Sequence, residues 1–496
     1  MRITNGMLVN NTLTNINRNK TKMDTLNSQL TTEKKIQRPS EDPIVAIRAL
    51  RFRSTLSEIE QYTERNIPDA ESWLGITDDA LGNVVTVLGD ITTYCEQAIN
   101  GYYDNDNKQT IVETLKAYRD QIYADANTDC AGRTIFTGYK TDTTLTFKED
   151  KPEQAFKMTQ KFTKENFDSL RKITNSVNIK GITVGNAAAI DTSAVLIPGY
   201  TDSYRIRLGY DNLDSDVLPA IQTYTIDEET GEKTIVEDRT PTLRNKTDAD
   251  AYSPGDDEIN YIAETGELIF GKNAYSAFSA VDGFDIAYQK TGFKKGELNP
   301  IHYFDCTDLL TDKTYTAKEQ PINYEVNFNQ TLQINVQGSD VFTHDLTRDL
   351  DDIIEGVNNV AEIESKIQQL QFMYDGCEEG SEGRNNLQVL IDNCKRELDF
   401  AKDELENRFG RSLTKYQNHQ NTVSQARADI GAREIRLDLT KERLSTQKTT
   451  VKSLKSTNEE VDVGEIAVEY KQAKSIYDAS LAAAAKVVEN KLIDFI

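Results

Sequence analysis

The stretch that decides the fold is residues 45–98, which read VAIRALRFRSTLSEIEQYTERNIPDAESWLGITDDALGNVVTVLGDITTYCEQA. Positions spaced alternately four and three apart form a seam in which thirteen of sixteen residues are apolar. A seam that repeats at this spacing is typical of a coiled coil. A second apolar series at intervals of seven, from Ile67 to Cys95, widens the stripe enough to meet more than one partner helix. The stretch therefore predicts one long helix inside a helical bundle.

Two prolines mark where this helix begins and where it is interrupted. Asp42 followed by Pro43 is a helix N-cap with proline at the first helical position. Pro68 lies inside the seam, where a missing N–H removes one backbone hydrogen bond. We expect the helix to begin at Pro43 and to kink or split at Pro68.

Both ends of the chain carry weaker seams of the same kind. The seam in residues 1–38 is interrupted by Lys20 and Asn27. The carboxyl-terminal part has one seam over residues 423–454 and, after a break near residues 457–464, another over residues 467–495. Long helices at both ends that share one periodicity are expected to pair with each other.

The weak terminal seams have two readings. The seams of residues 45–98 and 423–454 fit the core of a monomeric bundle. Short helices with polar interruptions are only marginally stable alone, so for residues 1–38 and 466–496 we favour contacts between subunits. The predicted assembly interface consists of Val9, Leu13, Ile16, Met23, Leu30, Tyr470, Tyr477, Leu481, Ala484, Val488 and Phe495.

Residues 145–339 differ from both ends because they alternate apolar and polar residues with period two. Examples are Tyr204 to Leu208, Thr223 to Ile226, Glu267 to Phe270 and Tyr324 to Phe328. The predicted fold class is mainly α with a β-rich insert, in which long terminal coiled-coil helices form a bundle. The expected domains are residues 1–42 with 460–496, residues 43–144 with 340–459, and the insert of residues 145–339, which we expect to be separable.

Composition excludes several classes of protein. The formal net charge of −24 disfavours binding to nucleic acid or to an anionic membrane surface. The apolar run from Leu481 to Ala485 is far shorter than the ~20 residues of a membrane helix, so we expect no membrane insertion. The amino terminus shows no apolar signal-peptide core. Five scattered cysteines are interpreted as reduced, small apolar residues.

The sequence offers no convincing catalytic or metal-binding group. His302, His344 and His419 are the only histidines, and no two of them lie within four residues of each other, as paired zinc-binding histidines on a helix would. No phosphate-binding glycine loop and no nucleophile elbow occur. The acidic clusters at residues 349–352 and 378–382 are interpreted as solvated helix faces. We therefore expect no enzyme, no catalytic residue, no cofactor and no metal.

Four short motifs resemble one family. Residues 32–43, TEKKIQRPSEDP, are similar to the basic turn followed by Pro-Ser-Asp-Asp-Pro in hook-filament junction proteins of the flagellin superfamily, although Glu33 stands where glycine is usual. Residues 132–141, GRTIFTGYKT, resemble the junction proteins more than flagellin itself. Residues 430–433 and 481–487 are similar to the carboxyl-terminal helices of the superfamily. The motif residues are Pro39, Ser40, Asp42, Pro43, Gly132, Arg133, Phe136, Gly138, Gly431 and Arg433.

The resemblance implies a function that periodicity alone does not give. It implies an extracellular structural subunit of the bacterial flagellum that joins hook to filament and is required for flagellin to assemble onto the hook. It also implies a homo-oligomeric ring, contacts with flagellin and with the neighbouring hook-associated protein, and type III export with a dedicated chaperone and no cleaved signal peptide. The alternatives are flagellin itself, another exported coiled-coil protein, a cytosolic coiled-coil scaffold, and a secreted hydrolase carried on flagella.

Overall fold

The computed structural model describes residues 5–99, 108–227, 230–248 and 250–493. The chain divides into two compact units. The first contains residues 1–71, 324–332 and 434–496, and the second contains residues 72–323 and 333–433. Long helices at both ends and β-strands in the middle confirm the predicted fold class. The three-domain division given above stays a prediction.

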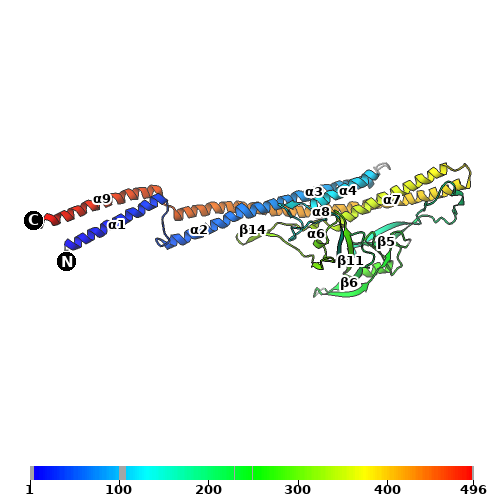
Figure 1. Cartoon of the computed structure of the whole chain (residues 1–496), viewed down its shortest axis with the longest axis horizontal. Helices are drawn as coiled ribbons and strands as arrows, with labels where there is room; N and C mark the ends of the chain where they lie inside the picture. The colour runs from blue at the N-terminus through cyan, green and yellow to red at the C-terminus, as the bar shows by residue number, and fades with distance from the viewer. Residues whose placement is uncertain (1–4, 100–107, 228–229, 249, 494–496) are drawn as a thin grey trace. The chain divides into compact units, whose positions relative to one another are not determined.

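Two terminal helices lie side by side in the first unit. They are α1 (Asn5–Thr32) and α9 (Val463–Ile493), and Figure 1 shows the N- and C-termini at the same end of the pair. Asn19 donates a 2.7 Å hydrogen bond from Nδ2 to Oγ of Ser480 across the pair. At the other end, the backbone N–H of Lys35 donates to the carbonyl of Glu459 at 2.8 Å. The two ends of the chain therefore pair as predicted.

The long helix predicted for residues 45–98 begins at the predicted position. Helix α2 (Pro43–Gln61) is capped by Asp42, whose Oδ1 accepts the N–H groups of Ile44 at 3.0 Å and Val45 at 3.1 Å. A π-helical turn, η1 (Tyr62–Asn66), then leads into α3 (Ile67–Ile99). Pro68 has no N–H and cannot donate a helical hydrogen bond. The π-helical turn just before it is a local departure from the regular α-helical hydrogen-bond pattern. The chain stays helical through Pro68, and the irregularity expected there takes the form of the π-helical turn at residues 62–66.

Helix α8 (Glu382–Glu459) is the long partner of α2 and α3. In the first unit its Glu459 pairs with Arg53 at 2.8 Å and its Lys448 pairs with Glu64 at 2.8 Å. It ends where the sequence predicted a break, because residues 460–462 separate it from α9. A hairpin of β14 (Asn323–Asn327) and β15 (Gln330–Gln333) adds Phe328, which packs edge-on against Tyr62.

The second unit builds its helical part around the later residues of α3. Leu74, Leu81 and Leu88 are completely buried there, so the wide stripe of the sequence is the bundle core. The other helices of this part are α4 (Lys108–Ala126), the short α6 (Gly338–Val341), α7 (His344–Asp375) and the first half of α8. Arg427 on α8 donates two 2.9 Å hydrogen bonds to Asp78 on α3.

The insert folds as two antiparallel sheets with one parallel edge pair. In hydrogen-bonded order, the five-stranded sheet is β4 (Asp168–Thr174), β5 (Gly199–Arg207), β10 (Glu267–Phe270), β9 (Ile259–Ile262) and β8 (Thr242–Arg244). The six-stranded sheet is β13 (Lys313–Tyr315), β12 (Asp305–Asp308), β3 (Lys151–Phe162), β11 (Gly283–Phe293), β6 (Ala220–Ile226) and β7 (Lys233–Arg239). Helix α5 (Lys272–Ser279) and the two-residue strands β1 (Asp129–Cys130) and β2 (Arg133–Thr134) also belong to the second unit.

The two sheets share one apolar core. Met158 and Tyr288 from the six-stranded sheet and Ile206, Tyr261 and Leu268 from the five-stranded sheet are all buried in one cluster. The strand signals read at Thr223 to Ile226 and at Glu267 to Phe270 therefore fall on real strands, β6 and β10.

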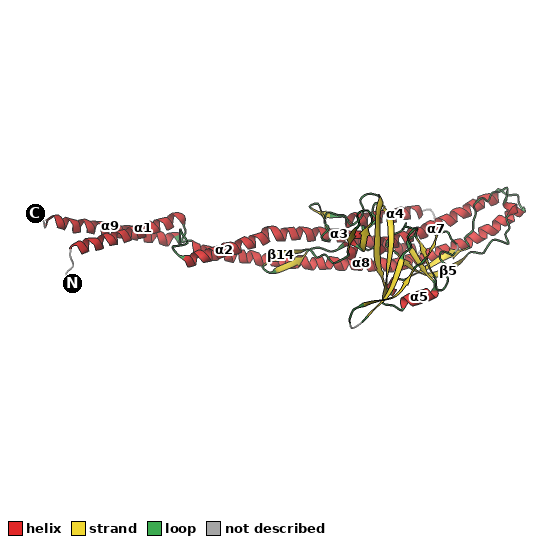
Figure 2. Cartoon of the chain, turned by 60° about the horizontal axis from the view of Figure 1, so that its bottom comes forward, coloured by secondary structure: helices red, strands yellow, loops and turns green. Residues whose placement is uncertain are grey.

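The insert packs against the helices, and whether it can be separated from them stays a prediction. Val177 and Ala187 of the insert are buried in one cluster with Leu370 of α7 and with Leu387 and Ile391 of α8. Figure 2 shows the strands gathered beside α7 and α8. Because apolar surface on the helices is covered by insert residues, the two parts share a core.

Candidate assembly surface

The predicted interface residues on α1 and α9 fall into two groups. Most of them are half-buried where the two helices pack together: Val9, Ile16, Met23, Leu30, Tyr470, Tyr477 and Ala484. Leu13 and Leu481 instead remain exposed. The side chain of Val488 and the whole of Phe495 lie outside the described residues. The seam read from the sequence is therefore mainly the contact between α1 and α9 within one chain.

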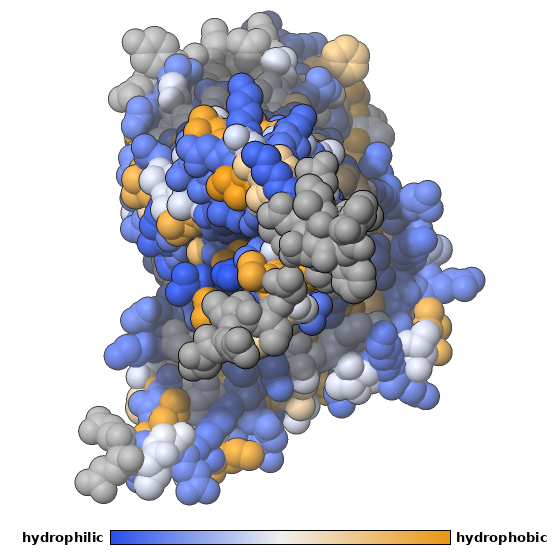
Figure 3. Space-filling view, turned by 90° about the vertical axis from the view of Figure 1, so that its left-hand side faces the viewer, coloured by the Kyte–Doolittle hydropathy of each residue, from blue (hydrophilic) through white to orange (hydrophobic). Residues whose placement is uncertain are grey.

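The pair of terminal helices buries little of its apolar surface. Leu26 and Ala473 are the only apolar side chains of the described parts of α1 and α9 that are fully buried. Met7, Leu8, Val468 and Ile476 are exposed, as are others on these helices, and the sequence reasoning missed these four. Figure 3 shows hydrophobic side chains scattered among hydrophilic ones on the side that it presents. Apolar side chains left in water on two paired helices favour contact with further helices.

The first family motif forms the turn between α1 and α2. Pro39, Ser40 and Pro43 are exposed, and Asp42 caps α2. Glu33, which stands where the family usually has glycine, adopts φ +58° directly after α1. A left-handed residue at this position ends many helices, and glycine adopts that conformation without a Cβ penalty. The departure seen in the sequence is thus a strained helix end.

The second family motif, residues 132–141, precedes the insert and contacts residues at and just after its end. Phe136 is buried and stacks edge-on against Phe342, and its carbonyl accepts the N–H of Gly338 at 2.7 Å. Gly138 is buried at φ +60°, whereas Gly132 is exposed at φ +79°. Arg133 is exposed and lies over the ring of Trp73 on α3, 5.3 Å from its centroid. The motif therefore joins α3 to the segment that follows the insert.

The third family motif, residues 430–433 on α8, also contacts the segment near the end of the insert. Arg433 is half-buried and donates from Nη1 to the carbonyls of Asn335 at 3.0 Å and Gln333 at 3.3 Å. Gly431 is half-buried, and a Cβ placed on it would meet no atom within 4 Å. The predicted motif residues thus lie at separate structural joints, and they do not converge on one site.

A buried ion-pair network joins the insert to the helices, and it corrects the interpretation of residues 349–352 as a solvated face. Arg205 on β5 is almost completely buried and contacts three carboxylates: Asp168 at 2.9 Å, Glu267 at 2.8 Å and Asp352 at 2.7 Å. Arg207 reaches Asp352 at 3.0 Å and also pairs with Asp349. Two arginines alternating along a strand, opposite an acidic helix segment, were the signal that sequence reasoning missed.

The charges of this network shift the pKa values of its carboxyl groups. Burial opposes ionisation of Asp349 and Asp352, but the neighbouring arginines outweigh it, so the pKa of each carboxyl lies well below its usual range. Lys415 adds a contact to Asp349 at 3.0 Å. Asp349 and Asp352 are therefore ionised, structural anions at neutral pH.

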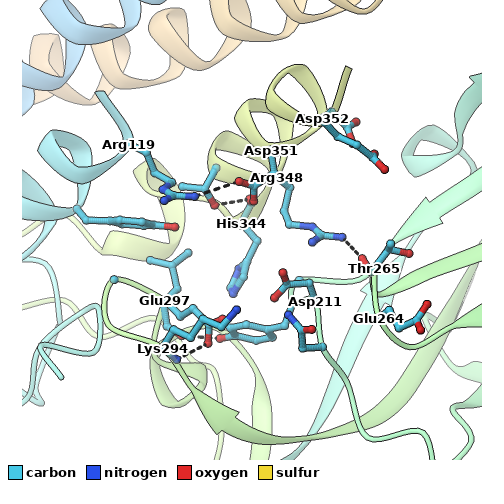
Figure 4. A pocket seen from close by; sticks show the side chains of 18 of the residues that line it. Arg119, Asp211, Glu264, Thr265, Lys294, Glu297, His344, Arg348, Asp351 and Asp352 are labelled. Carbon is cyan, nitrogen blue, oxygen red and sulfur yellow. Dashed lines mark hydrogen bonds and ion pairs between the residues drawn. The ribbon is translucent and has the colours of Figure 1, made fainter. Parts of the chain in front are cut away.

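A pocket of about 560 Å³ lies between α4, α7 and loops of the insert (Figure 4). Arg119 pairs with Asp351 at 3.1 Å on its wall, and Arg348 donates to the carbonyl of Thr265. Burial lowers the pKa of His344 to about 3, so its imidazole is neutral. None of the predicted interface or motif residues lines this pocket.

The pocket is lined by both acidic and basic side chains, and the acidic ones are in excess. Lys294 and Arg348 lie in its lining together with Asp211 and Glu264 (Figure 4). Among the described residues, no three His, Cys, Asp or Glu side chains gather as a metal site requires. In the same part of the chain, no helix combines the length and apolar character that crossing a membrane demands.

Comparison with known proteins matches both ends of the chain. Residues 3–141 match the bacterial flagellin N-terminal helical region, and residues 413–496 match the bacterial flagellin C-terminal helical region. Flagellar hook-associated protein 3 of Escherichia coli (strain K12) is 29% identical over 152 residues, or 30% of this chain and 47% of that protein. The protein of the same name from Salmonella typhimurium (strain LT2) is 29% identical over 143 residues, or 29% of this chain and 45% of that protein.

The chain spans about half the length of the curated relatives it matches. A solved structure of flagellar hook-associated protein 3 from Legionella pneumophila aligns with 81% of this chain and 96% of its own, at 11% identity and a TM-score of 0.31. The two matched regions contain the paired helices α1 and α9 and the helices that continue from them. The chain is thus similar to the flagellin superfamily in these two terminal regions.

Proposed function

We propose that this chain is a structural, non-enzymatic subunit of the bacterial flagellum that forms the junction between hook and filament. The observation that carries the proposal is the pair α1 and α9, which buries few apolar side chains within the chain and leaves others in water. The similarity of the chain to flagellar hook-associated protein 3 supports the junction over the filament itself. Flagellin remains the alternative.

The proposal includes partners and a location. Subunits form a homo-oligomeric ring outside the cell, with flagellin on one side and another hook-associated protein on the other, after export with a dedicated chaperone. The predicted interface residues contribute in two ways: those half-buried between α1 and α9 shape the helix pair, while Leu13 and Leu481 contact neighbouring subunits. The domain division follows the same logic, with residues 1–42 and 460–496 as the inner domain.

The test places a charge on the exposed part of this surface. In a strain lacking the chain, Leu13→Asp and Leu481→Asp should each leave the purified subunit as stable as the parent, because both side chains already face solvent. In the assembled junction each should bury an unpaired carboxylate, which is strongly unfavourable, so filaments should be lost. Filament counts by electron microscopy and thermal melting of the subunit are the measurements.

A matched control is Leu196→Asp, since Leu196 is also an exposed leucine but lies in the insert. It should leave filaments intact. Immunogold labelling distinguishes the alternatives: label confined to the hook-filament boundary supports the junction, and label along the whole filament supports flagellin. Normal filaments in both charged variants would contradict the role of Leu13 and Leu481.

A further inference from the structure

Helix α2 carries a second apolar stripe that its own unit does not cover. Ile44, Ile47 and Leu50 are 64%, 54% and 65% exposed. They follow one another at three-residue intervals and lie on the side of the helix opposite the coiled-coil seam, which includes Val45 and Ala49. Helix α2 packs against α8 through the seam. The outer stripe therefore takes no part in the packing of its own unit.

Two unpaired cations accompany the stripe. Arg48 and Arg51 are exposed, and neither forms an ion pair with any described residue. Arg53, by contrast, turns toward the chain's own Glu459 at 2.8 Å. Apolar side chains flanked by free guanidinium groups are typical of a contact surface, and in an acidic chain they favour an acidic partner.

Helix α9 has a face with the opposite charge. Val468 and Ile476 are 56% and 55% exposed, and Glu465 and Glu469 lie on the same side of the helix. The side that packs on α1 is centred on the half-buried Tyr470 and Tyr477, about a quarter turn away, and the buried Ala473 lies between the two sides. The two lysines of this part of the helix, Lys471 and Lys474, project from another side again. This face of α9 is therefore apolar and acidic.

We propose that the outer face of α2 in one copy of the chain binds the acidic face of α9 in a second copy. Arg48 and Arg51 are three residues apart and Glu465 and Glu469 are four apart, so each pair spans about one helical turn of ~5.4 Å and both pairs can meet at once. The contact also buries the exposed apolar side chains of both faces, which are Ile44, Ile47 and Leu50 on α2 and Val468 and Ile476 on α9. The inference rests on the proposed function, since it names the subunit contact of the same helical region.

The two faces belong to different helices, so the contact is heterologous. A heterologous contact repeats from copy to copy and produces a closed ring or an open helix, whereas a self-complementary face would stop at a dimer. A contact that repeats around a ring or helix is what the proposed junction subunit requires, since it would lie between the hook and the filament.

The experiment exchanges the charges on full-length chains. Sedimentation over a concentration series measures self-association of the parent, of Arg48→Glu with Arg51→Glu, of Glu465→Lys with Glu469→Lys, and of the chain with all four changes. Each double variant should raise the dissociation constant at least about tenfold, because like charges then face each other. The fourfold variant should restore it. Lys395→Glu with Arg396→Glu on α8 is the charge-matched control and should behave as the parent.

A photoreactive residue in place of Ile47 supplies a second readout, and it should cross-link to α9 of another copy. A parent that stays monomeric at every concentration, or a fourfold variant no better than the double variants, overturns the proposal. Immunogold labelling tests the junction role separately. If the label lies at the hook-filament boundary but the fourfold variant does not recover self-association, only this contact is rejected. If the fourfold variant recovers self-association but the protein is absent from flagella, only the junction role is rejected.

Discussion

At the scale of single residues, Gly132 and Gly138 of the second family motif differ in why a larger residue would be unfavourable. Both have positive φ, which costs a residue with a Cβ about 1–2 kcal/mol. A Cβ on Gly132 would meet nothing within 4 Å, whereas one on Gly138 would lie 2.5 Å from Oε1 of Gln320. That oxygen accepts the N–H of Tyr139 at 2.8 Å, so it is not free to move away.

We expect Gly132→Ala to lower the free energy of unfolding by about 1–2 kcal/mol through backbone strain alone. Gly138→Ala should cost a further ~1–3 kcal/mol because the added methyl group overlaps a fixed side chain. Urea unfolding followed by circular dichroism measures both, and each variant serves as the control for the other. Equal losses would show that the contact with Gln320 is unimportant.

Arg205 offers a second comparison at this scale, between a buried arginine and the half-buried Arg171 on the neighbouring strand. Arg205→Ala leaves one buried and two partly buried carboxylates without their shared cation and should cost roughly 3–5 kcal/mol. Arg171→Ala breaks the pair with the exposed Asp202 and should cost about 1 kcal/mol or less. Both values come from chemical unfolding at neutral pH. A loss at Arg205 as small as that at Arg171 would mean that water reaches the network.

At the scale of elements, the acidic segment of α7 makes the attachment of the insert dependent on pH. Asp349 and Asp352 have pKa values below those of the unfolded chain, so they contribute stability above pH ~4 that is lost as the pH falls. Glu355 behaves the same way, with its pKa lowered to about 2 in the folded state. Asp351 has a raised pKa and acts in the opposite direction.

We expect the melting temperature of the second unit to fall between pH 5 and pH 3. Asp352→Asn removes one depressed carboxyl, so the difference in stability between parent and variant should be greatest at pH 7 and should narrow toward pH 3. Calorimetry at several pH values gives the comparison. Parallel curves for parent and variant would exclude Asp352 as a source of the acid sensitivity.

The terminal helices differ from α3 in how much they bury. In the described part of α1 and α9 only Leu26 and Ala473 are fully buried apolar side chains, while Leu74, Leu81 and Leu88 of α3 have no exposure at all. We expect amide hydrogens of α1 and α9 in the free subunit to exchange far faster than those of α3, because few contacts oppose local opening. Comparable protection in a verified monomer would contradict folding on assembly.

At the scale of the whole molecule, the insert is joined to the helices by a short neck and a shared core. The ends of the insert meet, since a Cβ on Gly338 would lie 2.5 Å from Cδ1 of Leu145. Rejoining the chain there is therefore geometrically simple. The deletion nevertheless removes Val177 and Ala187, which cover Leu387, and it removes Arg205 and Arg207, which neutralise α7.

We expect the deletion of residues 146–337 to keep its helical circular dichroism but to melt at a much lower temperature than the parent. Adding Asp349→Asn and Asp352→Asn to the deletion should recover part of the loss, because two uncompensated charges are removed. The recovery distinguishes loss of the ion network from loss of apolar cover. A deletion variant as stable as the parent would restore the view of the insert as an independent domain.

The sequence by itself determined the helical half of this protein. The seam of residues 45–98, the cap at Asp42 and the break after α8 are local signals, and each appears in the structure where the pattern indicates. Periodicity and capping depend on neighbours within a few residues, so they can be read without knowing the fold. The pairing of the two ends also followed, because both carry seams of one period.

Only the tertiary structure decided which apolar faces are occupied and which charges are buried. The sequence assigned Val9, Ile16, Tyr470 and Tyr477 to contacts between subunits, but these side chains are half-buried between α1 and α9, and the outer stripe of α2 is left in water. The acidic segment of α7 looked solvated until β5, far away in the sequence, brought Arg205 against it. Burial and ion pairing depend on which distant segments meet, and that information is absent from any local pattern.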